Sequence, residues 1–492
     1  MARRVEPAFW EDKGVREAVS AWELGQVVRL FRQHTGASQA AVARLVSIDQ
    51  AEVSRLERGR KKIRDRRQLI RWAEALGIPE ELRGPLPTAE PSVQSAERKA
   101  RQQGSVTHVL DSLPSEGSGC LLFPPGRSFP ATPLPILAVR SVSLGARRLR
   151  LAPGGDMTAW SGVLMRALIS SSALSNGLRK QFVIDAGQAR RHIREGGPVD
   201  IPTAYELDDL TYGILWAAAG FDASFVTDEG LLHRIRSPLL RSDPERLHCA
   251  LEVPGLTDGS RMLLSSEACA GYIVDRRHHS TDGVVFWTRE KYGEEAATWL
   301  LFAHKLHYLQ QTAPAVPHSG GGRAFCVPEA AVAASPRYER VLLFLAMALM
   351  ESFGITTWLS VDAGYEQCEG FALEPGHKAI IATWVRADDG VKMAYTSRPG
   401  VLRGFAEVSG SASQHSVTAG SRPWQRLVAT ADYLRLDHLW LARRCRQLAS
   451  EGTHGLAAPR SRHLSVEGLD RACGFAAKCL AHAGASSRSM YR

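Results

Sequence analysis

The amino-acid sequence predicts a small all-α head at the N-terminus and a larger α+β body after it. Between residues 23 and 83, short helical segments follow one another, and most are ended by Gly or Pro. Residues 85–118 are rich in Pro, Ser, Gly and charge, a composition that is typical of a linker. Beyond residue 120, strand-like runs are mixed with longer helical stretches, as in an α+β domain.

The length indicates more than one folded unit. A chain of 492 residues exceeds one ordinary hydrophobic core and suggests about two or three domains. We expect an N-terminal arm and helix at 1–22, the head at 23–84, a flexible linker at 85–120 and the body at 121–492. Within the body, the segment TAPAVPHSGGGR at 312–323 is a candidate seam between two subdomains.

Positive charge is concentrated in the head. The formal net charge is +10, and residues 1–88 carry about 17 basic and 12 acidic side chains, whereas the remaining four-fifths of the chain is no more positive in total. In the stretch 49–71, nine positions are Lys or Arg, yet Val53, Leu56 and Ile63 recur as in a folded core. A folded basic surface of this kind indicates a negatively charged partner such as DNA.

Cysteines and apolar runs bear on the compartment. The eight cysteines form no CxxC pair and have no His at zinc-finger spacing, so we expect reduced thiols in a cytoplasmic protein. The longest strongly apolar run, VLLFLAMALM at 341–350, is about half the length needed to cross a bilayer. We therefore expect no membrane partner.

The head has the spacing of a helix-turn-helix. Two predicted helices of about eight residues lie three residues apart, and helices this short are stable only when they pack on each other. The predicted helices are 23–35 ended by Gly36, 39–46 capped by Ser38, 50–58 capped by Asp49 and ended by Gly59, and a further helix at 65–76.

The helix at 50–58 has one apolar and one polar face. Val53 and Leu56 point inward by helical periodicity, which leaves a polar face turned outward. An α-helix fits the major groove of DNA, where Gln and Arg pair with adenine or guanine edges and Ala contacts a thymine methyl group. The predicted base-reading residues are Gln50, Ala51, Ser54 and Arg55.

The head resembles a known family. Gly36-x-Ser38-Gln39, then Ala43, the run VSRLERG at 53–59 and WAEALG at 72–77 follow the pattern of the Cro/lambda-repressor (XRE) class over about 50 residues. The chain departs from this pattern at Ser47, where the family usually has Gly. The resemblance implies a lambda-repressor-like fold that binds double-stranded DNA.

The resemblance also implies roles for further residues. Gln39, at the start of its helix, would bind a phosphate through its side chain and the free N–H groups there. Arg32 and Glu57 match a partly buried ion pair that is structural. The expected phosphate-binding residues are Gln39, Arg58, Arg60, Lys61 and Lys62.

The body shows elements but little chemistry. GxSxG, HExxH and phosphate-loop motifs are all missing from the sequence. His304 and His307, three apart on one helix, are interpreted as half-buried residues, and the stretch 275–283 as a charged loop between strands, so neither a metal nor a cofactor is expected. We expect helices at 203–219 (opened by a capping box from Thr203 to Glu206), 290–311, 336–353, 423–450 and 465–483. We expect strands within 134–144, 354–362, 370–375 and 377–397, the last with a turn at Asp389-Gly390.

Five tryptophans of the body, Trp216, Trp287, Trp299, Trp358 and Trp384, are expected in the core, with an apolar pocket as the alternative. Parts of the body, such as IPTAYELDDLTYGILWAAAGFD at 201–222, resemble the C-terminal regions of large actinobacterial regulators, a resemblance that brings no chemistry with it.

The leading hypothesis is a cytoplasmic, sequence-specific transcription regulator, associated with the nucleoid when bound to its operator. We expect a homodimer, because two reading heads on half-sites about 34 Å apart multiply specificity. The body would dimerise and sense a small-molecule ligand or a small partner protein, without catalysis. The alternatives are an enzyme or toxin/antitoxin-like effector with an autoregulatory head, and a scaffold that grips another polypeptide.

Overall fold

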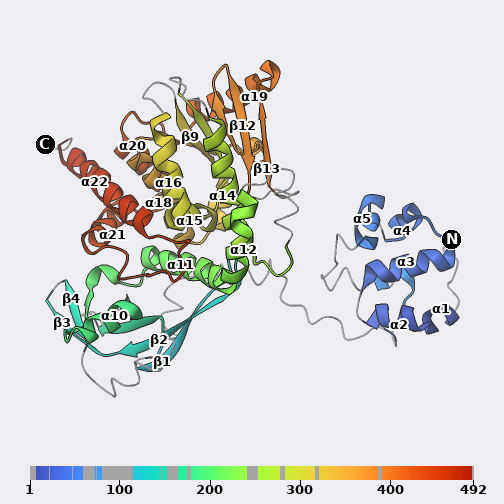
Figure 1. Ribbon diagram of the computed structural model, residues 1–492, viewed down its shortest axis with the longest axis horizontal. Helices are drawn as coiled ribbons and strands as arrows, with labels where there is room; N and C mark the ends of the chain where they lie inside the picture. The colour runs from blue at the N-terminus through green and yellow to red at the C-terminus, as the bar shows by residue number, and fades with distance from the viewer. Residues whose placement is uncertain are drawn as a thin grey trace. The chain divides into compact units, whose positions relative to one another are not determined.

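The computed structural model divides the chain into two compact units, one within residues 1–100 and one within 101–492. We keep the names head and body for them and describe each by itself (Figure 1). The structure describes residues 7–489 except 21–22, 47, 59–71, 74, 80–81, 83–112, 115, 146, 152–164, 174–178, 241–252, 278–282, 316–320 and 386–390.

Short helices around one apolar core form the described part of the head. The predicted helices at 23–35, 39–46 and 50–58 are present, and Gly36 ends the first with φ 67°. The Ser38 hydroxyl accepts a hydrogen bond from the Ala41 amide at 3.1 Å, whereas Asp49 makes no side-chain cap. Gly59 and most of the helix expected at 65–76 lie outside the described residues. The helices are α1 (Pro7–Glu11), α2 (Lys13–Ser20), α3 (Leu24–Thr35), α4 (Gln39–Val46) and α5 (Gln50–Glu57).

Two small sheets open the body. A four-stranded sheet has the order β1-β2-β5-β6, in which only β2 and β5 pair in parallel. A three-stranded antiparallel sheet has the order β3-β4-β7. Their strands are β1 (Gly117–Phe123), β2 (Thr132–Val139), β3 (Ser141–Leu144), β4 (Arg148–Leu151), β5 (Ala167–Ala173), β6 (Arg179–Asp185) and β7 (Asp200–Pro202), with α10 (Ala186–Arg194) after β6.

A six-stranded sheet lies further along the chain, with the order β10-β9-β8-β11-β12-β13. The first three strands of that order are parallel, and the remaining pairings are antiparallel. The hairpin expected within 377–397 is therefore present, although its turn lies outside the described residues. The strands are β8 (Val285–Thr288), β9 (Gly322–Cys326), β10 (Thr357–Ser360), β11 (Phe371–Glu374), β12 (Lys378–Thr383) and β13 (Lys392–Thr396).

Side-chain alternation gives this sheet two covered faces. Val285 and Trp287 of β8 pack with α19 (Pro399–Gln414) through Leu402, while Phe286 belongs to the main core of the body. Figure 1 shows α19 on one side of the sheet and α14 and α16 on the other. The helices in this part of the body are α11 (Asp209–Thr227), α12 (Glu229–Leu240), α14 (Asp258–Arg276), α15 (Gly293–Leu301), α16 (Ala303–Thr312), α17 (Glu329–Ala334), α18 (Arg337–Ser352), α20 (Pro423–Tyr433), α21 (His438–Glu451) and α22 (Glu467–Ser489).

Helix α18 is the centre of the body. Every residue from Val341 to Met350 is at most 2% exposed. A helix that is apolar on all sides must be surrounded by other elements, and α11, α15 and α22 pack against it. The apolar run at 341–350 is thus a core helix. Among the described residues, no helix has both the length and the apolar character to span a bilayer.

Several predicted element boundaries were wrong. The helix expected at 203–219 begins at Asp209, because Asp208 forms the capping box with Thr211 and accepts from the Leu210 and Thr211 amides. Residues 203–205 form a separate 3₁₀ turn, and Glu206 pairs with Lys180. Asp is a strong N-cap, and Arg444 also holds this one at 2.6 Å.

Other predicted elements are divided or shifted. The helix expected at 290–311 is broken at Phe302, whose extended backbone lets the Ala303 amide bond to the His463 carbonyl at 3.0 Å. The helix expected at 423–450 consists of α20 and α21. The strand expected within 134–144 consists of parts of β2 and β3, which belong to different sheets. Residues 117–120, which we placed in the linker, are part of β1. The expected loop at 275–283 begins inside α14 and precedes β8, so it does not connect two strands.

Substituting Gly293 tests the contact between α15 and α18. A Cβ atom at this position would lie 2.2 Å from the Glu339 carbonyl oxygen. We expect Gly293→Ala to lower the free energy of unfolding by about 1–3 kcal/mol, because backbone atoms must move to admit the methyl group. Urea denaturation of the full chain measures the effect.

Gly271 provides the matched control. It lies in α14, is exposed, and a Cβ atom there would meet nothing within 4 Å. Gly271→Ala should raise the stability by about 0.5–1 kcal/mol through helix propensity. Equal midpoints for the two variants would contradict the close packing of α15 on α18.

Candidate nucleic-acid interface

Helix α5 exposes the predicted reading residues and buries the apolar ones. Val53 and Leu56 are 0% and 3% exposed. Gln50, Ala51 and Arg55 are exposed to solvent, and Ser54 is half-buried at the edge of the same face. Arg58, the residue that ends α5, is also exposed. The outward face of α5 is therefore available to a partner.

A shared carboxylate holds α5 from behind. Glu57 is 8% exposed, and both of its oxygens accept from Nη1 of Arg32, at 2.8 and 2.9 Å. Nε of Arg32 donates to the Ala37 carbonyl at 2.9 Å, and the Arg29 guanidinium donates to the Glu57 carbonyl. Arg32 and Glu57 thus form an ion pair that ties α3 to the C-terminal end of α5.

Gln39 joins the same carboxylate. Its side-chain Nε2 donates to Oε2 of Glu57 at 2.7 Å, which connects the first residue of α4 to the last residue of α5. A primary amide has two N–H donors, so the contact to Glu57 leaves one donor for another acceptor. The position of Gln39 at the start of α4 is where a helix attracts anions.

A close backbone contact also positions α5, and sequence reasoning missed it. A Cβ atom at Gly25 of α3 would lie 2.3 Å from the Leu56 carbonyl oxygen, so only Gly fits without a shift of one helix. An isolated Gly near the start of a predicted helix was the available signal. Arg60, Lys61 and Lys62, together with the turn residue Ser47, lie outside the described residues.

The two histidines considered as metal ligands make separate contacts. Nε2 of His304 lies 3.0 Å from the Ser266 hydroxyl, and burial lowers the pKa of His304 well below its usual value. Nε2 of His307 lies 3.1 Å from the Gln311 amide nitrogen. Among the described residues, no group of three or more His, Cys, Asp or Glu side chains is arranged to hold a metal ion.

The tryptophans of the body divide between core and cavity. Trp216 is 1% exposed, and its indole donates to the Pro124 carbonyl at 2.9 Å. Trp358 is half-buried beside the core under α19. Trp287 and Trp299 are each 3% exposed and belong to the core, as expected. Together with the partly buried Trp384, they also line a cavity that contains charged side chains.

Comparison with known proteins supports the assignment of the head. Residues 23–86 match a protein-family model described as a helix-turn-helix domain. No curated protein and no solved structure matches the chain. The head is thus a helix-turn-helix domain of the DNA-binding kind. The matched range ends before the body, so the match assigns the body to no family.

Removing the Glu57 carboxylate should loosen the head. Glu57→Ala leaves Arg32 and Gln39 without their shared acceptor, which we expect to cost about 1–3 kcal/mol because the pair is only partly buried. Hydrogen exchange of the α3–α5 amides in the full chain should accelerate by about 5- to 150-fold. Glu23→Ala, which removes an exposed carboxylate just before α3, should leave exchange unchanged. Similar rates in both variants would exclude this role for Glu57.

Proposed function

We propose that the protein is a sequence-specific DNA-binding transcription regulator of the XRE type. The observation that carries the proposal is the outward face of α5, where Gln50, Ala51 and Arg55 are exposed while Val53 and Leu56 anchor the helix. An α-helix enters the major groove, about 12 Å wide, where these side-chain types distinguish base pairs. Ser54, at the edge of the face, contributes a hydroxyl that serves as donor or acceptor.

Phosphate contacts would flank the reading helix. The side-chain amide of Gln39 donates one N–H to Glu57, and its second N–H would contact a phosphate. The backbone N–H groups at the start of α4 would contact the same phosphate. Arg58 is exposed at the end of α5. Arg60, Lys61 and Lys62, the next basic residues in the sequence, would contact the neighbouring DNA backbone. Such contacts fix the orientation of the head on DNA without reading sequence.

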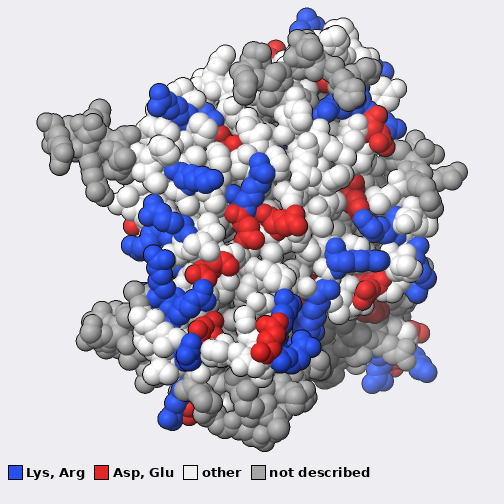
Figure 2. Space-filling model, turned by 60° about the vertical axis from the view of Figure 1, so that its left-hand side comes forward, with Lys and Arg blue, Asp and Glu red and all other residues white. Residues whose placement is uncertain are grey.

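Dimerisation and sensing are proposed for the body. A single head reads only a few base pairs, so two heads on half-sites about 34 Å apart give the required specificity. On the face shown in Figure 2, Lys and Arg side chains are interspersed with Asp and Glu side chains. We propose no catalysis for the body and a cytoplasmic location, associated with the nucleoid on DNA.

Arg55 is the most direct test of base reading. We expect Arg55→Ala to weaken binding to a duplex selected by the protein by about 1–3 kcal/mol, because a bidentate contact to one base is lost. Binding to a scrambled duplex should change much less. Fluorescence anisotropy with both duplexes measures this difference. Lys13→Ala, which removes an exposed charge on α2, is the matched control and should affect neither duplex strongly.

Lys62 separates phosphate contact from base reading. Lys62→Ala should weaken binding to all duplexes alike and lower the slope of log affinity against log salt by about one. Equal losses on selected and scrambled duplexes for Arg55→Ala would show that Arg55 contacts only the backbone. An intact chain that binds neither duplex at low salt would refute the proposed function.

A further inference from the structure

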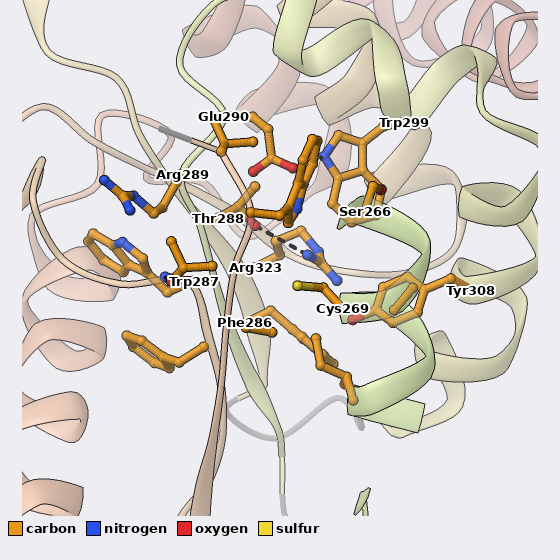
Figure 3. Close-up of a pocket in the computed structure, with 18 of the residues that line it drawn as sticks. Ser266, Cys269, Phe286, Trp287, Thr288, Arg289, Glu290, Trp299, Tyr308 and Arg323 are labelled. Carbon is orange, nitrogen blue, oxygen red and sulfur yellow. Dashed lines mark hydrogen bonds between the residues drawn. The ribbon is translucent and has the colours of Figure 1, made fainter. Parts of the chain in front are cut away.

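A small cavity lies inside the body between the six-stranded sheet and the helices that cover it. Its walls come from β8, β9 and β12 and from α14, α15 and α16, and its volume is about 40 Å³. Figure 3 shows Arg323 directed into this space among Trp299, Tyr308 and Cys269. Burial raises the pKa of the Cys269 thiol to about 12, so this thiol is unreactive at neutral pH.

Arg323 stands at a position where the sheet pattern calls for an apolar residue. It lies on β9, which has neighbours on both sides, and it is 3% exposed. Its register partner Phe286 and the helical residue Trp299 lie 4.5 and 4.7 Å from the guanidinium carbon, measured to their ring centroids. Nη1 donates to the Thr288 hydroxyl at 3.2 Å. Nε and Nη2 are buried and have no hydrogen-bond partner among the described residues.

The two nitrogens of Arg323 without a partner, Nε and Nη2, are the atoms through which two other arginines of this chain bind carboxylates. Nε and Nη2 of Arg150 donate to the two oxygens of Asp200 at 2.9 and 3.1 Å. The same two atoms of Arg426 bind the two oxygens of Glu351 at 2.7 and 2.6 Å. The planar fork matches the spacing of carboxylate oxygens, which gives strong bidentate pairs. In Arg323, which lines the cavity, both atoms of this fork are buried.

The charges around the cavity favour an anion. Lys305 and Arg323 line it together with a single acidic residue, Glu290. That carboxylate already accepts from the Trp299 indole at 3.0 Å and lies 4.0 Å from the Lys305 ammonium. Desolvation lowers the pKa of Lys305 to about 8, as expected for a buried cation with too little negative charge nearby. A bound anion would supply the missing charge.

Volume and charge restrict the class of anion. A water molecule needs roughly 10–15 Å³ of such space, so the cavity holds about three waters or a ligand of a few non-hydrogen atoms. The presence of Glu290 disfavours a dianion such as phosphate, because like charges at short range repel. A planar, singly charged group fits both limits.

We propose that this cavity binds a small organic monocarboxylate, with its two oxygens on Nε and Nη2 of Arg323 and its apolar end against the aromatic wall. The inference gives a ligand class to the sensing role proposed for the body and rests on that role only for its biological consequence. The binding itself is independent of DNA.

Thermal unfolding and calorimetry of the full chain without DNA test the inference. The probes are sodium acetate, propionate and pyruvate, compared with sodium chloride, acetamide and sodium phosphate at matched ionic strength. A carboxylate at about thirty times its Kd should raise the unfolding temperature of the body by about 2–4 °C. Chloride and the neutral amide should give no shift.

Variants at Arg323 separate binding from a structural role. Arg323→Met removes a buried charge with unpaired nitrogens, so the variant without probe should unfold at the wild-type temperature or higher, while the carboxylate-induced shift is lost. Arg323→Lys keeps the charge without the fork and should weaken binding at least tenfold. Arg150→Met, which removes an exposed fork from its pair with Asp200, should keep the wild-type shift.

Three outcomes would overturn the inference. The first is stabilisation by acetamide or chloride as large as that by the carboxylates. The second is a full carboxylate shift in Arg323→Met or in Arg323→Lys. The third is binding of phosphate but of none of the three carboxylates, which would make the site one for tetrahedral anions. Loss of DNA binding alone, with the carboxylate shift intact, would refute only the proposed function.

Discussion

The head depends on one carboxylate. Glu57, the last residue of α5, accepts from Arg32 on α3 and from Gln39 at the start of α4, so a single buried acceptor fixes three helices relative to one another. Each of these helices is too short to be stable alone. The orientation of the outward face of α5, and with it any reading of DNA, therefore follows from contacts made on its hidden side.

The body uses the same principle on a larger scale around an apolar helix. Acidic residues near the two ends of α18 pair with arginines: Glu339 with Arg127 at 3.0 Å, and Glu351 with Arg426 at 2.6 Å. Between them, ten residues bury their side chains completely or almost so. The ion pairs at the two ends fix the position of α18 along its axis. The apolar residues between them stabilise the body through the surface that they bury.

Sequence reasoning predicted the head better than the body, for physical reasons. Helix ends in the head are set by local signals, such as Gly36 and Ser38, and the period of Val53 and Leu56 identified the outward face of α5. In the body, helix boundaries depend on residues far away in the sequence. Arg444 stabilises the N-cap at Asp208, and the His463 carbonyl accepts from the Ala303 amide where the helix is broken at Phe302. The surroundings of Arg323 could not be predicted from the sequence, because the residues that line its cavity come from segments spread between positions 266 and 385.

The contact of Arg444 with Asp208 has a consequence for biosynthesis. Segments more than two hundred residues apart complete one another here, and the Asp185 amide likewise bonds to the Gly455 carbonyl at 2.8 Å. During synthesis, the first half of the body can complete its fold only after α21 and the turn that follows it have left the ribosome. The contacts of the head are local, so the head can fold as soon as it emerges. A nascent chain would thus expose apolar sheet surface for most of its synthesis, a period in which chaperones would have their main opportunity to act.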